Sequence, residues 1–224
     1  MTLETYPDRE MMMLAVADRL AAELGAALRR HARATLAVPG GTTPGPLFDG
    51  LAAIDLDWKR VDVVPTDERW VDEANPRSNA RLIRERLLTG HAAAANFVPL
   101  YTGGARPEGR IEEAARRVEA LLPISVLLLG MGEDGLVASL FPHAGGLKAA
   151  LAPDAPAVVA IRAEGQPEPR VSLSARALRG ALSAHVLITG AAKRATAEKA
   201  MKSRDPMAMP AALILNEATV HWAE

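Results

Sequence analysis

Residues 127–143 read LLLGMGEDGLVASLFPH, and this stretch decides the fold class. A run of branched apolar residues stops at Gly130, turns through a glycine-rich segment that carries Glu133 and Asp134, and resumes as a short apolar segment. An apolar run of this length predicts a strand that is buried on both faces of a sheet. The turn after it then brings charged groups to the carboxyl edge of that sheet, where α/β proteins bind their ligands.

The rest of the chain alternates predicted strands with predicted helices. Helices are expected over residues 8–31, 44–53 (with Thr43 as its N-cap), 77–88, 109–122 and 191–203. Strands are expected at residues 34–38, 61–65, 97–101, 124–130, 158–163, 171–174, 185–190 and 218–223. This order predicts an α/β fold with a mostly parallel, Rossmann-like sheet and helices on both faces. Because there is no linker or repeat, residues 1–224 are expected to form a single α/β domain.

The composition excludes several classes of function. Apolar residues make up 49% of the chain, charged residues 24%, and the formal net charge is −1, so we expect neither nucleic acid nor a membrane as a partner. The absence of cysteine excludes thiolate nucleophiles and cysteine-ligated zinc, and no histidine has a second ligand at metal spacing, so no metal site is expected. The beginning of the chain does not resemble a secretory signal, and a cytoplasmic protein is expected.

Residues 39–45, PGGTTPG, follow the first predicted buried strand. Gly40 and Gly41 would let a ligand approach the backbone closely, and Thr42 and Thr43 offer hydroxyl groups. The start of the next helix supplies unpaired N–H groups and a partial positive charge. The segment therefore suits a phosphate monoester on a small molecule, with a well-capped strand-to-helix turn as the alternative interpretation.

Residues 65–70, PTDERW, follow the next predicted strand. Arg69 offers a planar fork for a phosphate or carboxylate, and Asp67 could accept a proton or bind a sugar hydroxyl. An ion pair between the two is the structural alternative. Gly130, Gly132 and Gly135 form a G-x-G-x-x-G spacing, but the acids within it would repel a pyrophosphate, and we reject a dinucleotide site.

Taken together, these segments resemble one family. PGGTTPGPLF, TDERWV followed by NPRSNARL, and LLLGMGEDG with ASLFP are similar, in order and spacing, to the signature segments of 6-phosphogluconolactonases, and RVSLS, TGAAKRA and ATVHW also fit. The resemblance extends more distantly to glucosamine-6-phosphate deaminases and their fold. It implies hydrolysis of 6-phospho-D-glucono-1,5-lactone to 6-phospho-D-gluconate in the oxidative pentose phosphate pathway, without a cofactor. The expected partner is thus a small phosphorylated sugar lactone, bound by a monomer or homodimer.

The sequence departs from this family at one position. The family motif normally continues Asp-Gly-His, and that histidine is the usual candidate for the base that activates water, whereas this chain has Leu136. Leucine cannot accept a proton, so we expect Asp134, Asp67 or His143 to activate water instead. For His143, a solvent-exposed histidine is the alternative interpretation.

The resemblance also implies binding roles for two later residues. Arg170 and Lys193 resemble phosphate-contacting positions of the family, with surface ion pairs as the alternative. Two other functions remain open: a non-catalytic phosphosugar-binding relative, favoured by Leu136, and an aminosugar-phosphate isomerase or deaminase.

Overall fold

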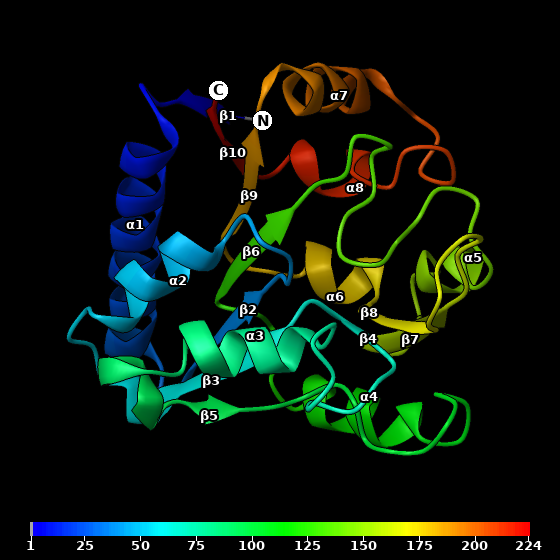
Figure 1. Cartoon of the computed structure of the whole chain (residues 1–224), viewed down its shortest axis with the longest axis horizontal. Helices are drawn as coiled ribbons and strands as arrows, with labels where there is room; N and C mark the ends of the chain where they lie inside the picture. The colour runs from blue at the N-terminus through cyan, green and yellow to red at the C-terminus, as the bar shows by residue number, and fades with distance from the viewer. Residues whose placement is uncertain (1) are drawn as a thin grey trace.

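The computed structural model describes residues 2–224, which form two sheets surrounded by helices (Figure 1). In the larger sheet seven strands run in the order β1-β10-β9-β6-β2-β3-β5, each parallel to its neighbours. Its strands are β1 (Thr2–Thr5), β2 (Ala34–Val38), β3 (Val61–Pro65), β5 (Asn96–Phe97), β6 (Val126–Gly130), β9 (Ala184–Thr189) and β10 (Thr219–Ala223). The predicted parallel α/β architecture is therefore confirmed.

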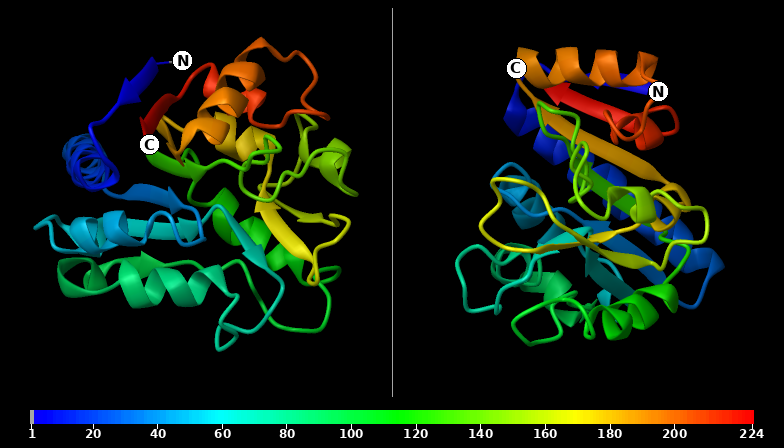
Figure 2. Two further views of the ribbon diagram at one scale, coloured as in Figure 1. Left: turned by 45° about the horizontal axis from the view of Figure 1, so that its top comes forward. Right: turned by 90° about the vertical axis from the view of Figure 1, so that its right-hand side faces the viewer.

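Two hydrophobic cores lie on opposite faces of this sheet, because successive strand side chains point to opposite sides. In β6, Val126 and Leu128 belong to one core, and Leu127 and Leu129 to the other. The first core is covered by α1 (Arg9–Arg30), α2 (Gly45–Ala52), α3 (Asn79–Arg86) and the 3-10 turns η1 (Trp58–Arg60) and η2 (Gly90–Ala94). The second is covered by α4 (Ile111–Glu119), α5 (Leu147–Ala150), α6 (Ala175–Arg179), α7 (Ala191–Lys202) and α8 (Ala212–Leu215) (Figure 2). Helices thus cover both faces, as predicted, and the single domain over residues 1–224 stays a prediction that this shared sheet supports.

The chain changes direction across the sheet between β2 and β6. From β2 it proceeds through β3 to β5 on one side, and then returns to place β6, β9 and β10 on the other side. The loops that leave β2 and β6 therefore diverge from adjacent strand ends. Such a switch point is where open α/β sheets form a ligand crevice.

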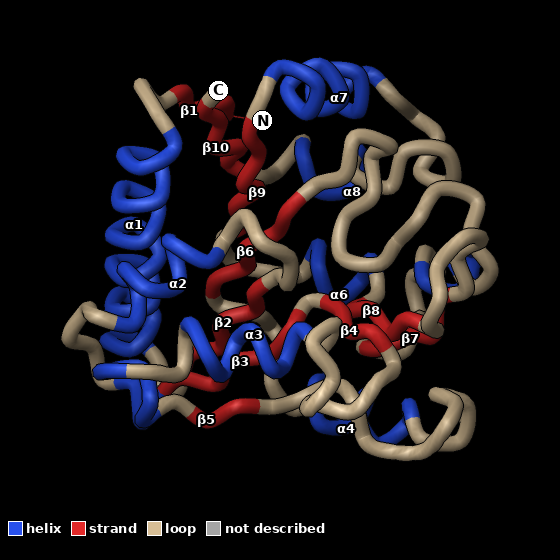
Figure 3. The backbone as a smooth tube through the Cα atoms, in the orientation of Figure 1, coloured by secondary structure: helices blue, strands red, loops and turns tan. Residues whose placement is uncertain are grey.

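Three further strands form a small antiparallel sheet beside the large one, in the order β4-β8-β7 (Figure 3). They are β4 (Asp67–Arg69), β7 (Val158–Ile161) and β8 (Arg170–Leu173). The strands predicted at residues 158–163 and 171–174 are present, but the segment between them is too short for the crossover that parallel pairing requires. They pair as a hairpin, and β4, which the sequence did not predict as a strand, completes the sheet.

Several predicted elements are longer than the observed ones, and two predictions at element ends are wrong in kind. Helix α2 begins at Gly45 with Pro44 in the N-cap position and without a side-chain cap, so Thr43 does not cap it. The strand expected at residues 97–101 is reduced to β5. By contrast, Asp8 caps α1 by accepting a hydrogen bond from the backbone N–H of Met11 at 2.8 Å.

Candidate active site

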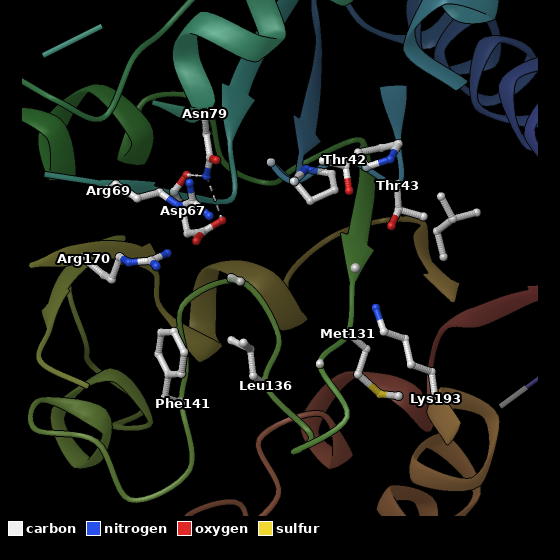
Figure 4. Close-up of a pocket in the computed structure, with 18 of the residues that line it drawn as sticks. Thr42, Thr43, Asp67, Arg69, Asn79, Met131, Leu136, Phe141, Arg170 and Lys193 are labelled. Carbon is white, nitrogen blue, oxygen red and sulfur yellow. Dashed lines mark hydrogen bonds between the residues drawn. The ribbon is translucent and has the colours of Figure 1, made fainter. Parts of the chain in front are cut away.

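A pocket of about 410 Å³ lies at the switch point, between the loops that follow β2 and β6 and one face of the small sheet (Figure 4). Its volume is in the range of sites that hold small-molecule ligands. The pocket brings together all the predicted substrate-binding residues and one of the three candidates for water activation: Gly40, Gly41, Thr42, Thr43, Asp67, Arg69, Arg170 and Lys193.

Asp134 and His143 do not line this pocket. The Asp134 side chain is exposed, and its Oδ1 accepts a hydrogen bond from the backbone N–H of Leu136 at 3.1 Å, which closes the turn after β6. His143 is also exposed, as its alternative interpretation expected, and its backbone N–H donates to the carbonyl of Met207 at 3.0 Å. The turn therefore uses the Asp134 carboxylate locally, and the structure does not support the predicted catalytic roles of either residue.

Strand register explains how the small sheet presents its polar residues. Asp67 and Arg69 are separated by one residue on β4, and they lie directly opposite Ser172 and Arg170 on β8. Since alternate residues of a strand share a face, the side chains of these four residues stand on the same side of the sheet. Figure 4 shows Asp67, Arg69 and Arg170 gathered at one end of the pocket.

Arg69 and Arg170 place two guanidinium groups side by side, near the Asp67 carboxylate but without a salt bridge to it. Within residues 2–224 neither arginine has an acidic partner within 4.0 Å, so the alternative of an Asp67–Arg69 ion pair is wrong. The Nε atoms of both are buried and have no hydrogen-bond partner among the described residues. Burial of Arg170, with the nearby charge of Arg69, lowers the pKa of the Arg170 guanidinium. Buried donors of this kind suit an anionic ligand.

The remaining contacts of the two arginines hold them in place. Nη1 of Arg69 donates to the carbonyl of Arg77 at 2.6 Å. Nη2 of Arg170 donates to Oε1 of Gln166 at 2.5 Å, and the guanidinium lies 5.7 Å from the centre of the Phe141 ring. Each arginine therefore has one anchored nitrogen, while its unpartnered Nε is left for a ligand.

Asp67 is the only acid among the described residues that line the pocket. Its side chain is 7% exposed, and its Oδ2 accepts a short hydrogen bond from the hydroxyl of Ser139. Its Oδ1 has two longer contacts of 3.4 Å, from the hydroxyl of Thr66 and from Nδ2 of Asn79. Asp67 is thus a buried carboxylate with neutral donors around it and positive charge close by, and it is the one carboxylate among the described lining residues that could accept a proton.

Sequence reasoning missed the role of Glu68, whose side chain is fully buried beside the pocket. Its carboxylate accepts hydrogen bonds from the backbone N–H groups of Asn79 and Ala80, at 2.8 and 2.7 Å, and from the hydroxyl of Ser78 at 3.1 Å. Burial raises the pKa of this carboxyl, and the donors at the start of α3 oppose that change. Glu68 thereby fixes the beginning of α3 against β4.

Asn79 reaches the pocket from this fixed helix start, and it was also missed as a site residue. Its Nδ2 donates to the backbone carbonyl of Asp67 at 2.9 Å. A Cβ atom on Gly40 would lie only 1.8 Å from Oδ1 of Asn79, so the loop after β2 can pass Asn79 only as glycine. The signal in the sequence was an acid at a strand end followed by Ser-Asn at a helix start.

The opposite end of the pocket is formed by the loop after β2 and by α7. Gly41 has a φ of +87°, a conformation that glycine adopts without strain, and the hydroxyls of Thr42 and Thr43 follow it. Lys193 extends toward the same end from α7 (Figure 4). The alternative of surface ion pairs is wrong for Lys193 and Arg170, because neither has an acidic partner within 4.0 Å in the described part of the chain.

An apolar wall separates the two charged ends. It includes Met131, Leu136, Ala138, Phe141 and Leu187, and none of the described lining residues is a histidine. Residues 2–224 contain no group of three or more histidine or acidic side chains arranged to hold a metal ion. Nor does this part of the chain include a helix with the length and hydropathy needed to cross a membrane.

A family model described as glucosamine-6-phosphate isomerases/6-phosphogluconolactonase matches residues 7–222. The chain belongs to this family. The resemblance predicted from the three strand-end segments is therefore confirmed. Two curated relatives are named 6-phosphogluconolactonase. The one from Rhizobium meliloti is 39% identical over 93% of each chain. The one from Caulobacter vibrioides is 38% identical over 99% of this chain and 97% of its own.

Solved structures of the same family share the fold closely. A 6-phosphogluconolactonase from Shewanella baltica superimposes with a TM-score of 0.94 at 31% identity and covers 100% of this chain and 97% of its own. One from Thermotoga maritima has a TM-score of 0.83 at 28% identity and covers 99% of this chain and 98% of its own. The α/β fold of this chain is therefore that of the family across the full length of its members.

Proposed function

We propose that this protein is a 6-phosphogluconolactonase, which hydrolyses 6-phospho-D-glucono-1,5-lactone to 6-phospho-D-gluconate in the oxidative pentose phosphate pathway. Two relatives of that name, 38–39% identical over nearly the whole chain, support the assignment. The observation that carries it is the pair of guanidinium groups of Arg69 and Arg170 beside Asp67, each with a buried Nε that has no hydrogen-bond partner among the described residues. That group can bind a developing negative charge and accept a proton in the same place.

The charges in the pocket favour one orientation of the substrate. A phosphate group carries up to two negative charges and would be repelled by the Asp67 carboxylate. Lys193, Thr42 and Thr43 lie at the other end of the pocket, in front of the start of α2. In this proposal the phosphate binds at that end, and the lactone carbonyl lies between Asp67 and the two arginines.

The chemistry follows from this orientation. Asp67 accepts a proton from a water molecule as the water oxygen attacks the carbonyl carbon. The carbonyl oxygen takes up negative charge, which Arg69 and Arg170 stabilise. When the bond between the carbonyl carbon and the ring oxygen breaks, the proton returns from Asp67 to that oxygen, and the product is an open-chain acid. General base catalysis of this kind contributes typically about 10²–10⁴-fold to the rate.

The test is the loss of the lactone, generated by enzymatic oxidation of glucose 6-phosphate and followed with and without the protein. We expect clear acceleration over buffer, and its loss in Asp67→Asn, which keeps the size of the side chain and removes its basicity. Circular dichroism should give the same spectrum for both proteins. Unchanged turnover in Asp67→Asn would refute its role as the base.

A second candidate function is non-catalytic binding of a phosphorylated sugar, and Leu136 favours it. This leucine lines the pocket and cannot accept a proton. Calorimetric titration with 6-phospho-D-gluconate, run beside the lactone assay, separates the two functions. Binding without acceleration would support the binding protein, while release of ammonia from glucosamine 6-phosphate would support the deaminase alternative.

The proposal includes two finer points about the protein in the cell. A phosphorylated sugar is strongly charged and stays in the compartment where it is made, which supports a cytoplasmic location. The pocket is built from the described residues of one chain, which is compatible with a monomer or a homodimer. Cell fractionation and light scattering of the purified protein test these two points.

A further inference from the structure

We infer that Ser139 is a positioning residue for Asp67: its buried hydroxyl holds one carboxylate oxygen and leaves the other to activate water. This inference rests on the proposed lactonase function and assigns the orientation of its base. Ser139 belongs to the same loop as Leu136, and its backbone N–H donates to the hydroxyl of Ser172 on β8 at 3.2 Å.

The donor in this contact is the serine. Ser139 has 0% exposure, and Oδ2 of Asp67 is the only acceptor that its hydroxyl contacts in the described chain. The neighbouring hydroxyl of Ser172 is already committed, because it donates to the carbonyl of Leu173 at 3.0 Å and accepts from the backbone N–H of Ser139 at 3.2 Å. The Ser139 hydroxyl therefore has no competing acceptor and donates to Asp67.

This contact makes the two carboxylate oxygens unequal. Oδ2 accepts the short hydrogen bond from Ser139, whereas the two contacts to Oδ1, from Thr66 and Asn79, are both 3.4 Å long. The better hydrogen bond of the Asn79 amide, at 2.9 Å, goes to the backbone carbonyl of Asp67 instead. Oδ1 therefore retains capacity to accept a hydrogen bond from water.

The conformation of the loop after β6 directs the Ser139 hydroxyl toward Asp67. Isolated bridges join Met131 to Val137 and Val137 to Leu140, so the segment folds back on itself directly after β6. Ala138 adopts a φ of +49°, which is strained for a residue with a Cβ atom. The strained residue immediately precedes Ser139. The surrounding bridges hold it in a conformation that turns Ser139 toward Asp67.

The electrostatic surroundings of Asp67 come from three directions. Arg69 and Arg170 share its face of the sheet, and Glu68 lies on the opposite face of β4. The amide of Asn79, from α3, is neutral. Removal of the Ser139 hydroxyl leaves these charged groups in place, so its effect on the ionised carboxylate can be measured separately.

The experiment compares Ser139→Ala with Thr196→Val, using the full-length protein in the lactone assay across pH. A hydrogen bond to an ionised carboxylate favours that form over the protonated one. Ser139→Ala should therefore move the acidic limb of kcat/KM to higher pH and lower kcat by about tenfold, with less than a twofold change in KM. Thr196→Val removes a different anchor of the same loop, the hydrogen bond of 2.9 Å from the Thr196 hydroxyl to the carbonyl of Glu133, and leaves the contacts of Asp67 and Ser139 in place, so its acidic limb should stay at the wild-type position.

Ser139→Cys supplies the matched rescue, because a thiol of similar size is a weaker donor and should give an intermediate shift of the limb. Thermal unfolding of each variant shows how much folded protein enters the assay. An acidic limb that is unmoved in both Ser139→Ala and Ser139→Cys would overturn the inference and leave the hydroxyl a purely structural role. Asp67→Asn separates this from the proposed function. If that variant is inactive and the limb of Ser139→Ala is unmoved, only the inference about Ser139 fails.

Discussion

Two clusters of buried polar side chains lie at different places in this fold, and they differ in how completely their groups are paired. At the pocket, Arg69 and Arg170 keep buried Nε donors without partners. Between the terminal strands and α1 lies a second group, the histidine cluster, in which every member contacts another member: Glu4, Tyr6, Glu23, His185 and His221.

The histidine cluster forms a continuous chain of hydrogen bonds. The Tyr6 hydroxyl donates to Glu4 at 2.9 Å, so Nδ1 of His221 must donate to the Tyr6 oxygen, at 2.8 Å. Nε2 of His221 then accepts from Nδ1 of His185 at 2.9 Å. Nε2 of His185 lies 2.8 Å from Glu23 and completes the chain. Burial, followed by the nearby His185, lowers the pKa of His221 to about 4, which agrees with its role as a neutral acceptor.

The difference in hydrogen-bond pairing indicates how burial of polar groups affects stability in each of the two clusters. A paired cluster offsets the cost of removing its groups from water, and loss of one member leaves the others unsatisfied. An unpaired buried donor costs stability, and such a group persists where a ligand can supply the missing partner. We therefore expect the histidine cluster to contribute to stability and the arginine pair to contribute to the proposed function.

The largest expected effect comes from Arg170→Met at the unpaired site. Loss of one of two cations facing the lactone oxygen should lower kcat/KM by about 100-fold or more. Stability should stay unchanged or rise by about 1 kcal/mol, because an unneutralised buried charge is removed. Lactone kinetics and urea unfolding measure the two effects. Arg176→Met is the control: Arg176 is paired with Glu119, so its loss should slightly reduce stability and leave kinetics unchanged. A strongly destabilised but active Arg170→Met would contradict the comparison.

His221→Leu should give the opposite pattern at the paired cluster. It leaves the ring N–H of His185 and the oxygen of Tyr6 without their partner in the interior, which should cost about 2–4 kcal/mol of unfolding free energy. None of the cluster residues lines the pocket, so kcat/KM per folded molecule should be unchanged. Urea unfolding with parallel kinetics tests both statements, and equal stability of the two proteins would show that the cluster contributes nothing.

The same cluster predicts how stability depends on pH. His221 titrates near 4 when folded and near 6.5 when unfolded, so between these values the unfolded state binds more protons. Stability from this group is complete above pH 6.5 and falls as the pH drops toward 4, by roughly 3 kcal/mol or less. Urea unfolding at a series of pH values gives the slope. In His221→Leu the unfolding free energy should change less with pH between pH 4 and 6.5. An identical slope in the variant and the wild-type protein would mean that other groups cause the pH dependence of stability.

A smaller effect on activity is expected at Gly40, where the backbone of the loop after β2 passes close to Asn79. Gly40→Ala places a Cβ atom against Asn79, which must turn away from the backbone of Asp67. We expect kcat/KM to fall by about tenfold, with a loss of about 1 kcal/mol in stability. Gly50→Ala in α2 is the control, because its Cβ would make an ordinary contact of 3.6 Å with Ala17. It should gain about 0.5–1 kcal/mol from helix propensity without a change in activity. Equal kinetics for both variants would refute the role of this close approach.

The smallest expected effect comes from Leu136→His. This variant adds to the pocket an imidazole, the same titratable group that His185 and His221 contribute to the histidine cluster. We expect turnover at neutral pH to rise by up to about tenfold, and the pH profile to acquire a limb near pH 6.5. Rates measured from pH 5 to 8 test this. Unchanged turnover would contradict this expectation and would mean that a side chain at position 136 does not reach the attacking water.

Much of the fold could be predicted from local patterns. The mostly apolar runs of β2, β3 and β6 predict strands that are buried on both faces of a sheet. Their polar members, Thr35 and Asp62, are buried with hydrogen-bond partners. The glycines and polar residues that follow these runs predict the ends of the strands, because turn residues act over a few neighbouring positions. The small sheet was not predicted, because β4 is short and polar, and its pairing with β8 depends on a segment far away in the chain.

The candidate site divides in the same way. That Gly40, Thr42, Asp67 and Arg69 would lie at one edge of the sheet followed from their positions directly after strands. The choice between Asp67 and Asp134 did not, because both follow strands and both are acids. Only the turn geometry shows that the Asp134 carboxylate bonds its own loop while that of Asp67 faces the pocket.

The sequence by itself determined the parallel sheet, the edge at which ligands bind and the family to which the chain belongs. Those features rest on residue periodicity and on glycine turns, which act over a few neighbouring positions. The tertiary structure alone decided that Arg69 lies opposite Arg170, that Ser139 holds Asp67, and that the histidines close a chain of their own. Each of these depends on register between distant segments, which is set when the two cores pack and not by any local pattern.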